Sequence, residues 1–157
     1  MKRIPFLAAA GMICLLLLAG TSSALLMDLS KEDLINNCEA IVQGTVSDIY
    51  SAWNSERTRI YTYATLTISD QFKGESVSSE IVIQIPGGTA DDVTLTVSDT
   101  PTLELGMDII IHTFTKETGH TWIYGWEKGV LGVVNGYIPE YKMTIEQFRQ
   151  LVENTVH

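Results

Sequence analysis

Cysteine, histidine and basic residues are scarce in this sequence, and each shortage narrows the range of functions. The chain has 2 cysteines and 3 histidines, and its 19 acidic residues outnumber 10 basic ones, for a net charge of −9. A surface with this excess of negative charge repels phosphate backbones and anionic lipid. We therefore expect no nucleic-acid partner and no electrostatic attachment to membranes. Solubility, or selective binding of a cationic partner, is compatible with the charge.

The first 24 residues have the three parts of a secretory signal peptide. Lys2 and Arg3 precede an uncharged, mainly apolar run over residues 4–19, and Ser22-Ser23-Ala24 supplies small residues for cleavage. The apolar run is shorter than the roughly 20 residues that a membrane-spanning helix needs. We expect cleavage after Ala24 and a secreted or cell-envelope protein. The alternative is an uncleaved signal that serves as an N-terminal anchor.

Cleavage after Ala24 would leave residues 25–157 as a single domain, long enough to bury a core without covalent crosslinks. Its net charge would be −11, because 8 of the 10 basic residues and all 19 acidic ones remain. Cys38 would be its one cysteine, so packing must replace disulfides as the source of stability. Cys38 precedes an apolar run, which predicts a small buried side chain. An intermolecular disulfide or a reactive thiol is the alternative.

Short β-strand patterns dominate the middle of the chain. Strands are predicted at 40–50, 59–72, 80–85, 93–97, 107–115 and 121–126. Gly44 indicates a bulge or a sharp bend in the first of them, and Pro86-Gly87-Gly88 ends the third. Asn135-Gly136, between 130–134 and 137–142, is typical of a type I′ hairpin turn.

A helix is predicted on each side of these strands. Ser30 with Asp33, and Thr144 with Gln147, have the spacing of capping boxes, and apolar residues recur at helical spacing after Thr144. Strands with glycine kinks between two helices predict a mainly β protein. More specifically, we expect a small antiparallel β-barrel like the oligonucleotide/oligosaccharide-binding (OB) fold, with a short N-terminal helix, an extra C-terminal hairpin and a C-terminal amphipathic helix. An open antiparallel sheet covered by the C-terminal helix is the alternative.

Three short segments within residues 33–126 share a pattern with a known family. They are Cys38-Glu39-Ala40-Ile41-Val42-Gln43-Gly44-Thr45-Val46, then Phe72-Lys73-Gly74, and Leu105-Gly106 before the apolar strand 109–111. The pattern resembles the netrin-like module shared with the tissue inhibitors of metalloproteinases, and the chain is similar to small exported prokaryotic domains whose role is not established. The resemblance implies an OB fold. Those inhibitors chelate a protease zinc through an N-terminal cysteine, whereas the terminus expected here is Leu25, so that mechanism does not carry over.

No catalytic constellation is recognisable in the sequence. It has no Gly-x-Ser-x-Gly nucleophile elbow, no His-Glu-x-x-His zinc motif and no phosphate-binding glycine loop. His112 and His120 flank a predicted turn, and a carboxylate from Asp108 or Glu117 would complete a metal site there. Because no ligand spacing supports that site, we expect one packed and one solvated histidine instead. We therefore predict that the protein is not an enzyme and that it binds no cofactor and no metal.

Aromatic residues give the best indication of a binding surface. Tyr61 and Tyr63 fall on the polar face of the predicted strand 59–72, and Trp53 lies in the preceding loop. A second set, Trp122, Tyr124 and Trp126, falls on one face of the predicted strand 121–126. We expect one set to be core and the other to bind an extracytoplasmic protein or glycan, with Tyr61, Tyr63 and Trp53 as the working surface. The alternative is that the C-terminal helix covers the tyrosines.

The predicted function is therefore that of an exported, non-catalytic binding or interaction module. Two alternatives remain open. One is a protease inhibitor that acts through a protruding loop at 88–101. The other is a small enzyme whose pocket brings His112 together with carboxylates.

Overall fold

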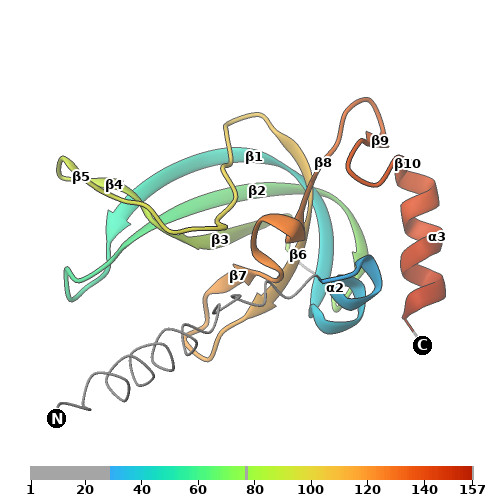
Figure 1. Ribbon diagram of the computed structural model, residues 1–157, viewed down its shortest axis with the longest axis horizontal. Helices are drawn as coiled ribbons and strands as arrows, with labels where there is room; N and C mark the ends of the chain where they lie inside the picture. The colour runs from blue at the N-terminus through green and yellow to red at the C-terminus, as the bar shows by residue number, and fades with distance from the viewer. Residues whose placement is uncertain (1–28, 77, 157) are drawn as a thin grey trace, which may run out of the picture.

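A mixed six-stranded sheet carries most of the fold, and both helices lie at one end of it (Figure 1). The computed structural model describes residues 29–76 and 78–156. The predicted signal peptide, residues 1–24, lies outside the described residues. In the described part of the chain, no helix is both long and apolar enough to cross a membrane. The prediction of a mainly β protein with a helix on each side of the strands is confirmed.

Two long strands, β1 (Ala40–Trp53) and β2 (Ile60–Lys73), pair antiparallel along their length. The register shifts between Gln43 and Gly44, but the extra residue is Ser69, so the bulge at this point lies in β2 and not in β1 as predicted. A Cβ atom on Gly44 would lie 2.7 Å from the carbonyl oxygen of Thr67. Only glycine therefore allows the two backbones to approach this closely.

The remaining strands of the sheet continue from β2. The strand β3 (Glu80–Pro86) pairs antiparallel with β2, and β7 (Thr121–Ile123) pairs parallel with β3. The strand β6 (Asp108–Thr115) pairs with β7 and β8 (Val130–Gly132) along one edge and with β1 along the other. The order is thus β1-β2-β3-β7-β6-β8, with an additional pairing between β1 and β6.

Both predicted capping boxes are present. The helix α2 (Lys31–Asn37) begins after Ser30, which exchanges hydrogen bonds with Asp33, and α3 (Ile145–Thr155) begins after Thr144 in the same way. The other end of α2 is held by the Lys73 ammonium, which donates to the carbonyl oxygens of Ile35, Asn36 and Cys38 at 2.6, 3.0 and 2.7 Å. Because the last carbonyls of a helix have no partner within it, this lysine ties α2 to the end of β2.

Two hydrophobic clusters pack against opposite faces of β1 and β6. Alternation along the strands divides them: Val42 and Ile111 point into the first cluster, whereas Ile41 and Ile110 point into the second. The second cluster includes Phe148 and Val152 of α3, which therefore covers β1 and β6. Phe148 also contacts Phe72 near the end of β2, with 5.2 Å between the ring centroids. The part of β2 that carries the predicted tyrosines lies away from this helix.

The turn of the predicted C-terminal hairpin is present, but its two arms do not pair with each other as β-strands. Asn135 and Gly136 adopt φ values of +52° and +76°, and Val134 and Tyr137 exchange backbone hydrogen bonds across them. Beyond that bridge, β8 pairs with β6, and β9 (Tyr137–Ile138) pairs with β10 (Met143–Thr144). The arms separate because each buries its own apolar residues in the second cluster, Leu131 and Val133 from one arm and Ile138 from the other.

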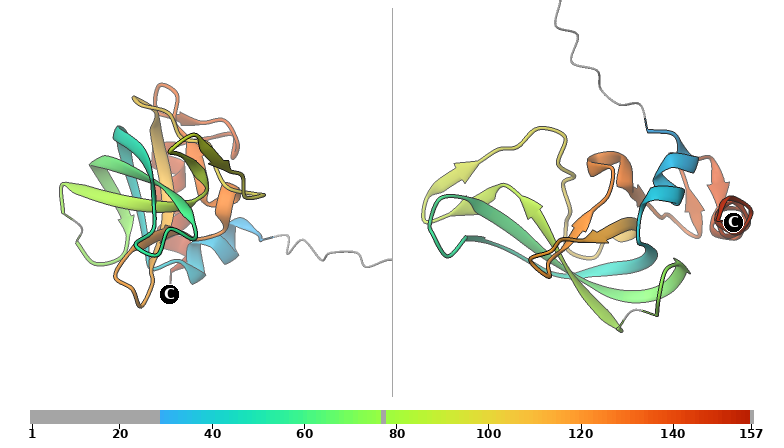
Figure 2. Two further views of the ribbon diagram at one scale, coloured as in Figure 1. Left: turned by 90° about the vertical axis from the view of Figure 1, so that its left-hand side faces the viewer. Right: turned by 90° about the horizontal axis from the view of Figure 1, so that it is seen from below.

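The predicted strand 121–126 is too long by three residues. It ends at Ile123, because Gly125 and Trp126 take left-handed backbone conformations and a 3-10 turn, η1 (Trp126–Gly129), follows. The strand expected at 93–97 is also shorter. It is β5 (Val93–Leu95), which forms a small hairpin with β4 (Gly88–Ala90) at the end of the molecule opposite α3 (Figure 2).

Candidate functional site

The register of β1 and β2 decides which of the predicted site residues share a face. Opposite residues of an antiparallel pair point to the same side of a sheet. Trp53 pairs with the buried Ile60, whereas Tyr63 pairs with Tyr50. Trp53 therefore lies on the inner face, and Tyr61 and Tyr63 lie on the outer one. The structure brings the two tyrosines together and separates Trp53 from them.

A bulge in β1 causes this separation. Residues Val42 and Val46 face the first cluster, so uninterrupted alternation would turn Tyr50 inward and Trp53 outward. The register shifts between Val46 and Asp48, however, and Ile49 then faces the cluster instead. The extra residue exchanges the two faces for the rest of the strand.

Four aromatic side chains gather on the outer face, and we call them the aromatic face: Tyr50, Tyr61, Tyr63 and Trp122. Tyr50 stacks on Tyr63 with ring centroids 5.2 Å apart, and Tyr61 meets Trp122 edge-on at 5.9 Å. Both separations are favourable for aromatic pairs. Tyr50 is 53% exposed and the other three are half-buried. The aromatic face is thus an ordered surface that solvent reaches.

Gln84 connects the two aromatic pairs. It lies on β3, is buried, donates its amide to the Tyr63 hydroxyl oxygen at 3.1 Å and accepts from the Trp122 indole N–H at 2.9 Å. Each pair therefore has one ring fixed by the same side chain, which pre-organises the aromatic face. Sequence reasoning missed Gln84, although a lone glutamine in the apolar strand Glu-Ile-Val-Ile-Gln-Ile-Pro signals a buried polar role.

An apolar cavity of about 300 Å³ adjoins Trp122. This size lies at the lower end of the range for small-molecule pockets. Its wall comes from five separate segments and includes Ile85, Pro86, Pro101, Phe114, Trp122 and Trp126. Among the described residues that form the wall, Lys116 is the only charged one. Its Nζ lies 3.2 Å from the centre of the Trp122 ring.

The second predicted aromatic set lines this cavity instead of forming a core. Tyr124 is half-buried and Trp126 is 47% exposed. The prediction that one of the two aromatic sets is core is wrong, because none of the six residues is buried. Aliphatic side chains fill the first cluster, and Tyr124 packs only at the edge of the second.

His112 and His120 do not face each other. His112 is fully buried in β6, where its Nδ1 lies 3.0 Å from the Gly129 carbonyl oxygen and its ring meets Phe148 edge-on. Burial lowers the pKa of His112 to about 4, so the ring is neutral at pH 7 and Nδ1–H donates to Gly129. His120 is exposed. The prediction of one packed and one solvated histidine is confirmed, and the described residues contain no group of three or more His, Cys, Asp or Glu arranged to hold a metal ion.

Cys38 is a packed thiol. It is 4% exposed, its Sγ lies 3.5 Å from the Ile35 carbonyl oxygen, and burial raises its pKa to about 11. A buried thiol that stays protonated at neutral pH is a poor nucleophile and has no access to a partner chain. The prediction of a small buried side chain is confirmed.

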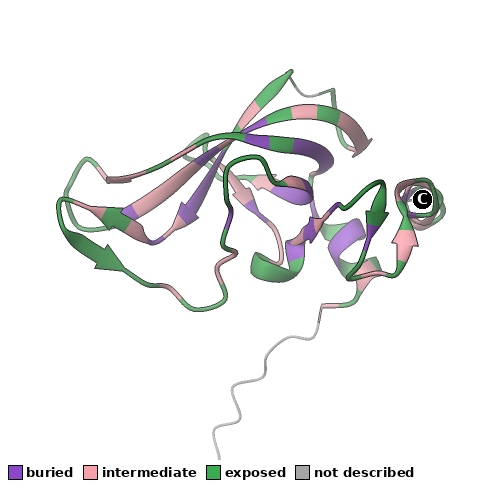
Figure 3. Cartoon of the chain, turned by 90° about the horizontal axis from the view of Figure 1, so that it is seen from above, coloured by how far each residue is buried: buried purple, intermediate pink, exposed green. Residues whose placement is uncertain are grey.

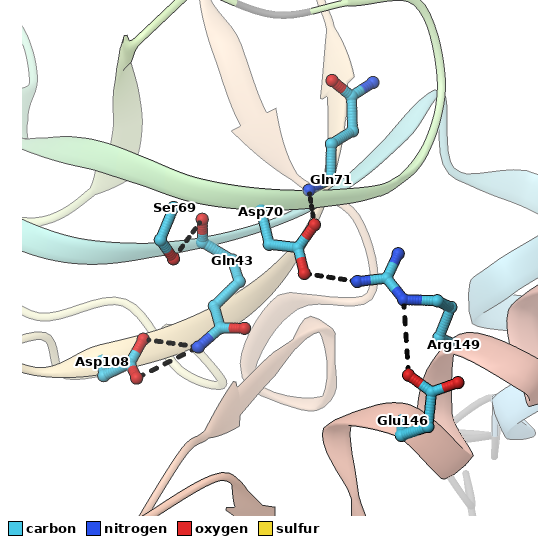
Figure 4. Close-up of polar contacts among 7 residues, drawn as sticks. All are labelled: Gln43, Ser69, Asp70, Gln71, Asp108, Glu146 and Arg149. Atoms are coloured by element: carbon cyan, nitrogen blue, oxygen red, sulfur yellow. Dashed lines mark hydrogen bonds and ion pairs between the residues drawn. The ribbon is translucent and has the colours of Figure 1, made fainter.

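A polar cluster links the sheet to α3 (Figure 4). Gln43 donates to both carboxylate oxygens of Asp108 at 3.1 Å, and Arg149 of α3 pairs with Asp70 of β2 and with Glu146. Asp70 and Asp108 each have a partner from a neighbouring element, and Glu146 pairs with Arg149 within α3. This arrangement indicates that the cluster positions α3, and it leaves no cation directed at a ligand among these residues.

The β4–β5 hairpin is a braced protrusion. Its tip is joined to the β1–β2 turn by a salt bridge of 2.6 Å between Arg57 and Asp91. At its base, a Cβ on Gly88 would lie 2.3 Å from the Ser51 hydroxyl oxygen, so the backbone sits directly on the β1–β2 arm. All three residues of β5 are exposed, including Val93 and Leu95 (Figure 3).

No protein-family model matches this sequence, and no curated protein matches it either. The function must therefore be inferred from the aromatic face, the cavity and the protruding hairpin.

Proposed function

We propose that the protein is an exported, non-catalytic binding module that captures an extracytoplasmic protein or glycan on the aromatic face. The observation that carries this proposal is the hydrogen-bonded link through Gln84, which holds half-buried rings of Tyr63 and Trp122 in fixed orientations. Rings of this kind offer broad contact area at a small entropic cost on binding. Flat aromatic surfaces stack on sugar rings and also anchor protein side chains.

The proposed architecture is an OB-like barrel, as the netrin-like resemblance implies. In its support, β1 pairs with β2 on one edge and with β6 on the other, so the strand order returns to its first member. In OB folds, ligands lie on the face of the second and third strands and on neighbouring loops. Two members of the aromatic face, Tyr61 and Tyr63, lie on β2, with Gln84 on β3, and Lys116 lies in the adjoining β6–β7 loop.

The test compares the secreted protein with a double variant, Tyr61→Ala with Tyr63→Ala, on a glycan array and in pull-downs from cell-envelope extract. The matched control is Tyr137→Ala, which removes a 41% exposed tyrosine outside the aromatic face. We expect wild type and control to retain the same ligand, and the double variant to lose it while it still unfolds in one cooperative transition. Equal retention by all three proteins would contradict the proposal.

Export is tested separately by mass spectrometry of the native protein. The expected mature N-terminus is Leu25, which follows from the small residues before it. A native chain that begins at Met1 would contradict cleavage, and a cytoplasmic location would contradict export.

Protease inhibition through the β4–β5 hairpin is a second candidate function. It is supported by the exposed Val93 and Leu95 on a hairpin that the Arg57–Asp91 bridge braces. A panel of secreted proteases would be assayed with wild type and with Val93→Glu, Leu95→Glu. Inhibition by wild type that the double variant lacks supports this function, and no inhibition of any protease counts against it.

A further inference from the structure

The walls of the cavity beside Trp122 are apolar and come from distant parts of the chain. Ile85 and Pro86 end β3, Pro101 lies in the loop before β6, and Phe114 and Trp122 belong to the β6–β7 hairpin. Apolar walls that face a void lose contacts with partner atoms. An apolar ligand would restore those contacts, and water would not.

Trp126 adopts a strained backbone conformation at the edge of this cavity. Its φ is +55°, in the left-handed region that bulky residues rarely occupy. Its side chain is 47% exposed, so burial within the chain does little to offset that strain. Contact with a bound molecule gives a reason for a tryptophan at this position.

Lys116 sets the charge of the site. Among the described residues that line the cavity it is the one with a formal charge, and it pairs with no carboxylate in the described chain. Glu39, which is near in the fold, accepts a hydrogen bond from the Thr115 N–H at 2.8 Å. The ring of Trp122 holds the ammonium at the rim, where it is available to an anion.

We infer that this cavity binds a small amphipathic carboxylate, with the apolar part among Phe114, Trp122 and Trp126 and the carboxylate paired with Lys116. The volume of about 300 Å³ equals that of about ten water molecules in the liquid. It suits an alkyl chain or ring system of roughly ten non-hydrogen atoms. The inference does not depend on partner capture by Tyr61 and Tyr63, because those side chains lie outside the cavity wall.

The test is calorimetric titration of the secreted protein with octanoate, decanoate, dodecanoate, 1-decanol and decylamine, each below its micellar concentration. Each added methylene should tighten carboxylate binding about fourfold until the cavity is full. Decanoate should bind more tightly than 1-decanol, and decylamine should bind most weakly. Equal affinities for decanoate and decylamine, or no saturable binding of any probe, would overturn the inference.

Two lysine variants measure what the charge contributes to binding, separately from the contribution of the apolar wall. Lys116→Gln should weaken decanoate binding about fivefold and leave 1-decanol unchanged, as for one partly exposed ion pair. The matched control is Lys142→Gln, which removes the same charge from an exposed position outside the cavity wall and should change neither affinity. An equal loss in both lysine variants would contradict a specific role for Lys116.

Trp126→Asn relieves backbone strain, because asparagine tolerates the left-handed region. We expect an unchanged or raised melting temperature together with weaker binding of both decanoate and 1-decanol. A lowered melting temperature with unchanged affinity would assign Trp126 a structural role and contradict the inference. Tyr61→Ala with Tyr63→Ala should still bind decanoate, so this experiment can succeed even if the aromatic face captures no partner.

Discussion

The helix end and the hairpin end of the molecule use their apolar residues differently. At the helix end, β1 and β6 are packed on both faces, and Ile41, Ile110 and Phe148 are all fully buried. At the hairpin end, large side chains remain at the surface, with Tyr50 at 53%, Val93 at 47% and Leu95 at 38% exposed. Figure 3 shows the same contrast between the buried strand centres and the exposed β4–β5 ribbon.

The contrast indicates a division of labour between stability and binding. Aliphatic residues form the clusters that hold the sheet, since they have no polar atoms to satisfy when buried. Tyr63 and Trp122 lie where one part of the ring packs and the polar atom finds a partner in Gln84. Substitutions at the helix end should therefore affect folding, and substitutions at the hairpin end should affect ligands.

The largest effect is expected at Phe148. Its ring is fully buried and meets Phe72, His112 and Tyr141, so Phe148→Ala should lower the free energy of unfolding by about 3–5 kcal/mol. Urea denaturation measures this change. Tyr50→Ala, at the opposite end, is the control and should stay within about 1 kcal/mol of wild type. Similar losses in both variants would contradict the division between the two ends.

The next effect is a loss of stability in acid, also at the helix end. The pKa of His112 is lowered to about 4 in the folded protein. The unfolded chain binds the proton below pH 6.5 and the folded chain does not until about pH 4, so stability falls as pH decreases through that interval. The loss attributable to His112 should be about 3 kcal/mol. Urea melts at pH 7, 5.5 and 4 on wild type and His112→Gln measure it, and parallel pH profiles would count against this cause.

A smaller effect is expected at Gln84, which serves the aromatic face. Gln84→Leu leaves the Tyr63 hydroxyl and the Trp122 indole N–H without their shared partner and should cost about 1–2 kcal/mol, because water reaches both half-buried rings. Near-ultraviolet circular dichroism should also weaken as the rings lose their fixed orientation. An unchanged aromatic spectrum would show that packing alone orders the aromatic face.

The smallest effect is expected on the protruding hairpin. Val93→Lys places a charge on an exposed strand and should change stability by no more than about 0.5 kcal/mol. Thermal melts measure it, with Ile83→Lys in the buried part of β3 as the contrasting variant that should not fold. Marked destabilisation by Val93→Lys would mean that the hairpin packs more tightly than its exposure indicates.

Local signals in the sequence account for much of the fold. The helix caps at Ser30 and Thr144 and the turn at Asn135-Gly136 lie where they were predicted, and the register shifts at Gly44, although the bulged residue is on β2. These features depend on residues within a few positions of each other. The side-chain alternation of β2 was predictable for the same reason.

The candidate site was only partly predictable. The outer position of Tyr61 and Tyr63 follows from alternation within one strand, but the inner position of Trp53 follows from a bulge at Ser47 of β1 that no glycine signals. The link through Gln84 and the cavity wall join strands that are far apart in the sequence. Such contacts depend on which strands become neighbours.

By itself, the sequence determined the β-rich class, the two capped helices and the burial of Cys38 and His112, because short-range patterning and hydrophobicity govern these features. Only the tertiary structure decided that Tyr50 joins Tyr63, that Trp122 meets Tyr61 and Gln84, and that Lys116 and Trp126 line one cavity. The physical reason is register: a shift of one residue moves every later side chain of a strand to the other face. Register is set jointly by partner strands and clusters, so it becomes defined when the whole sheet has assembled.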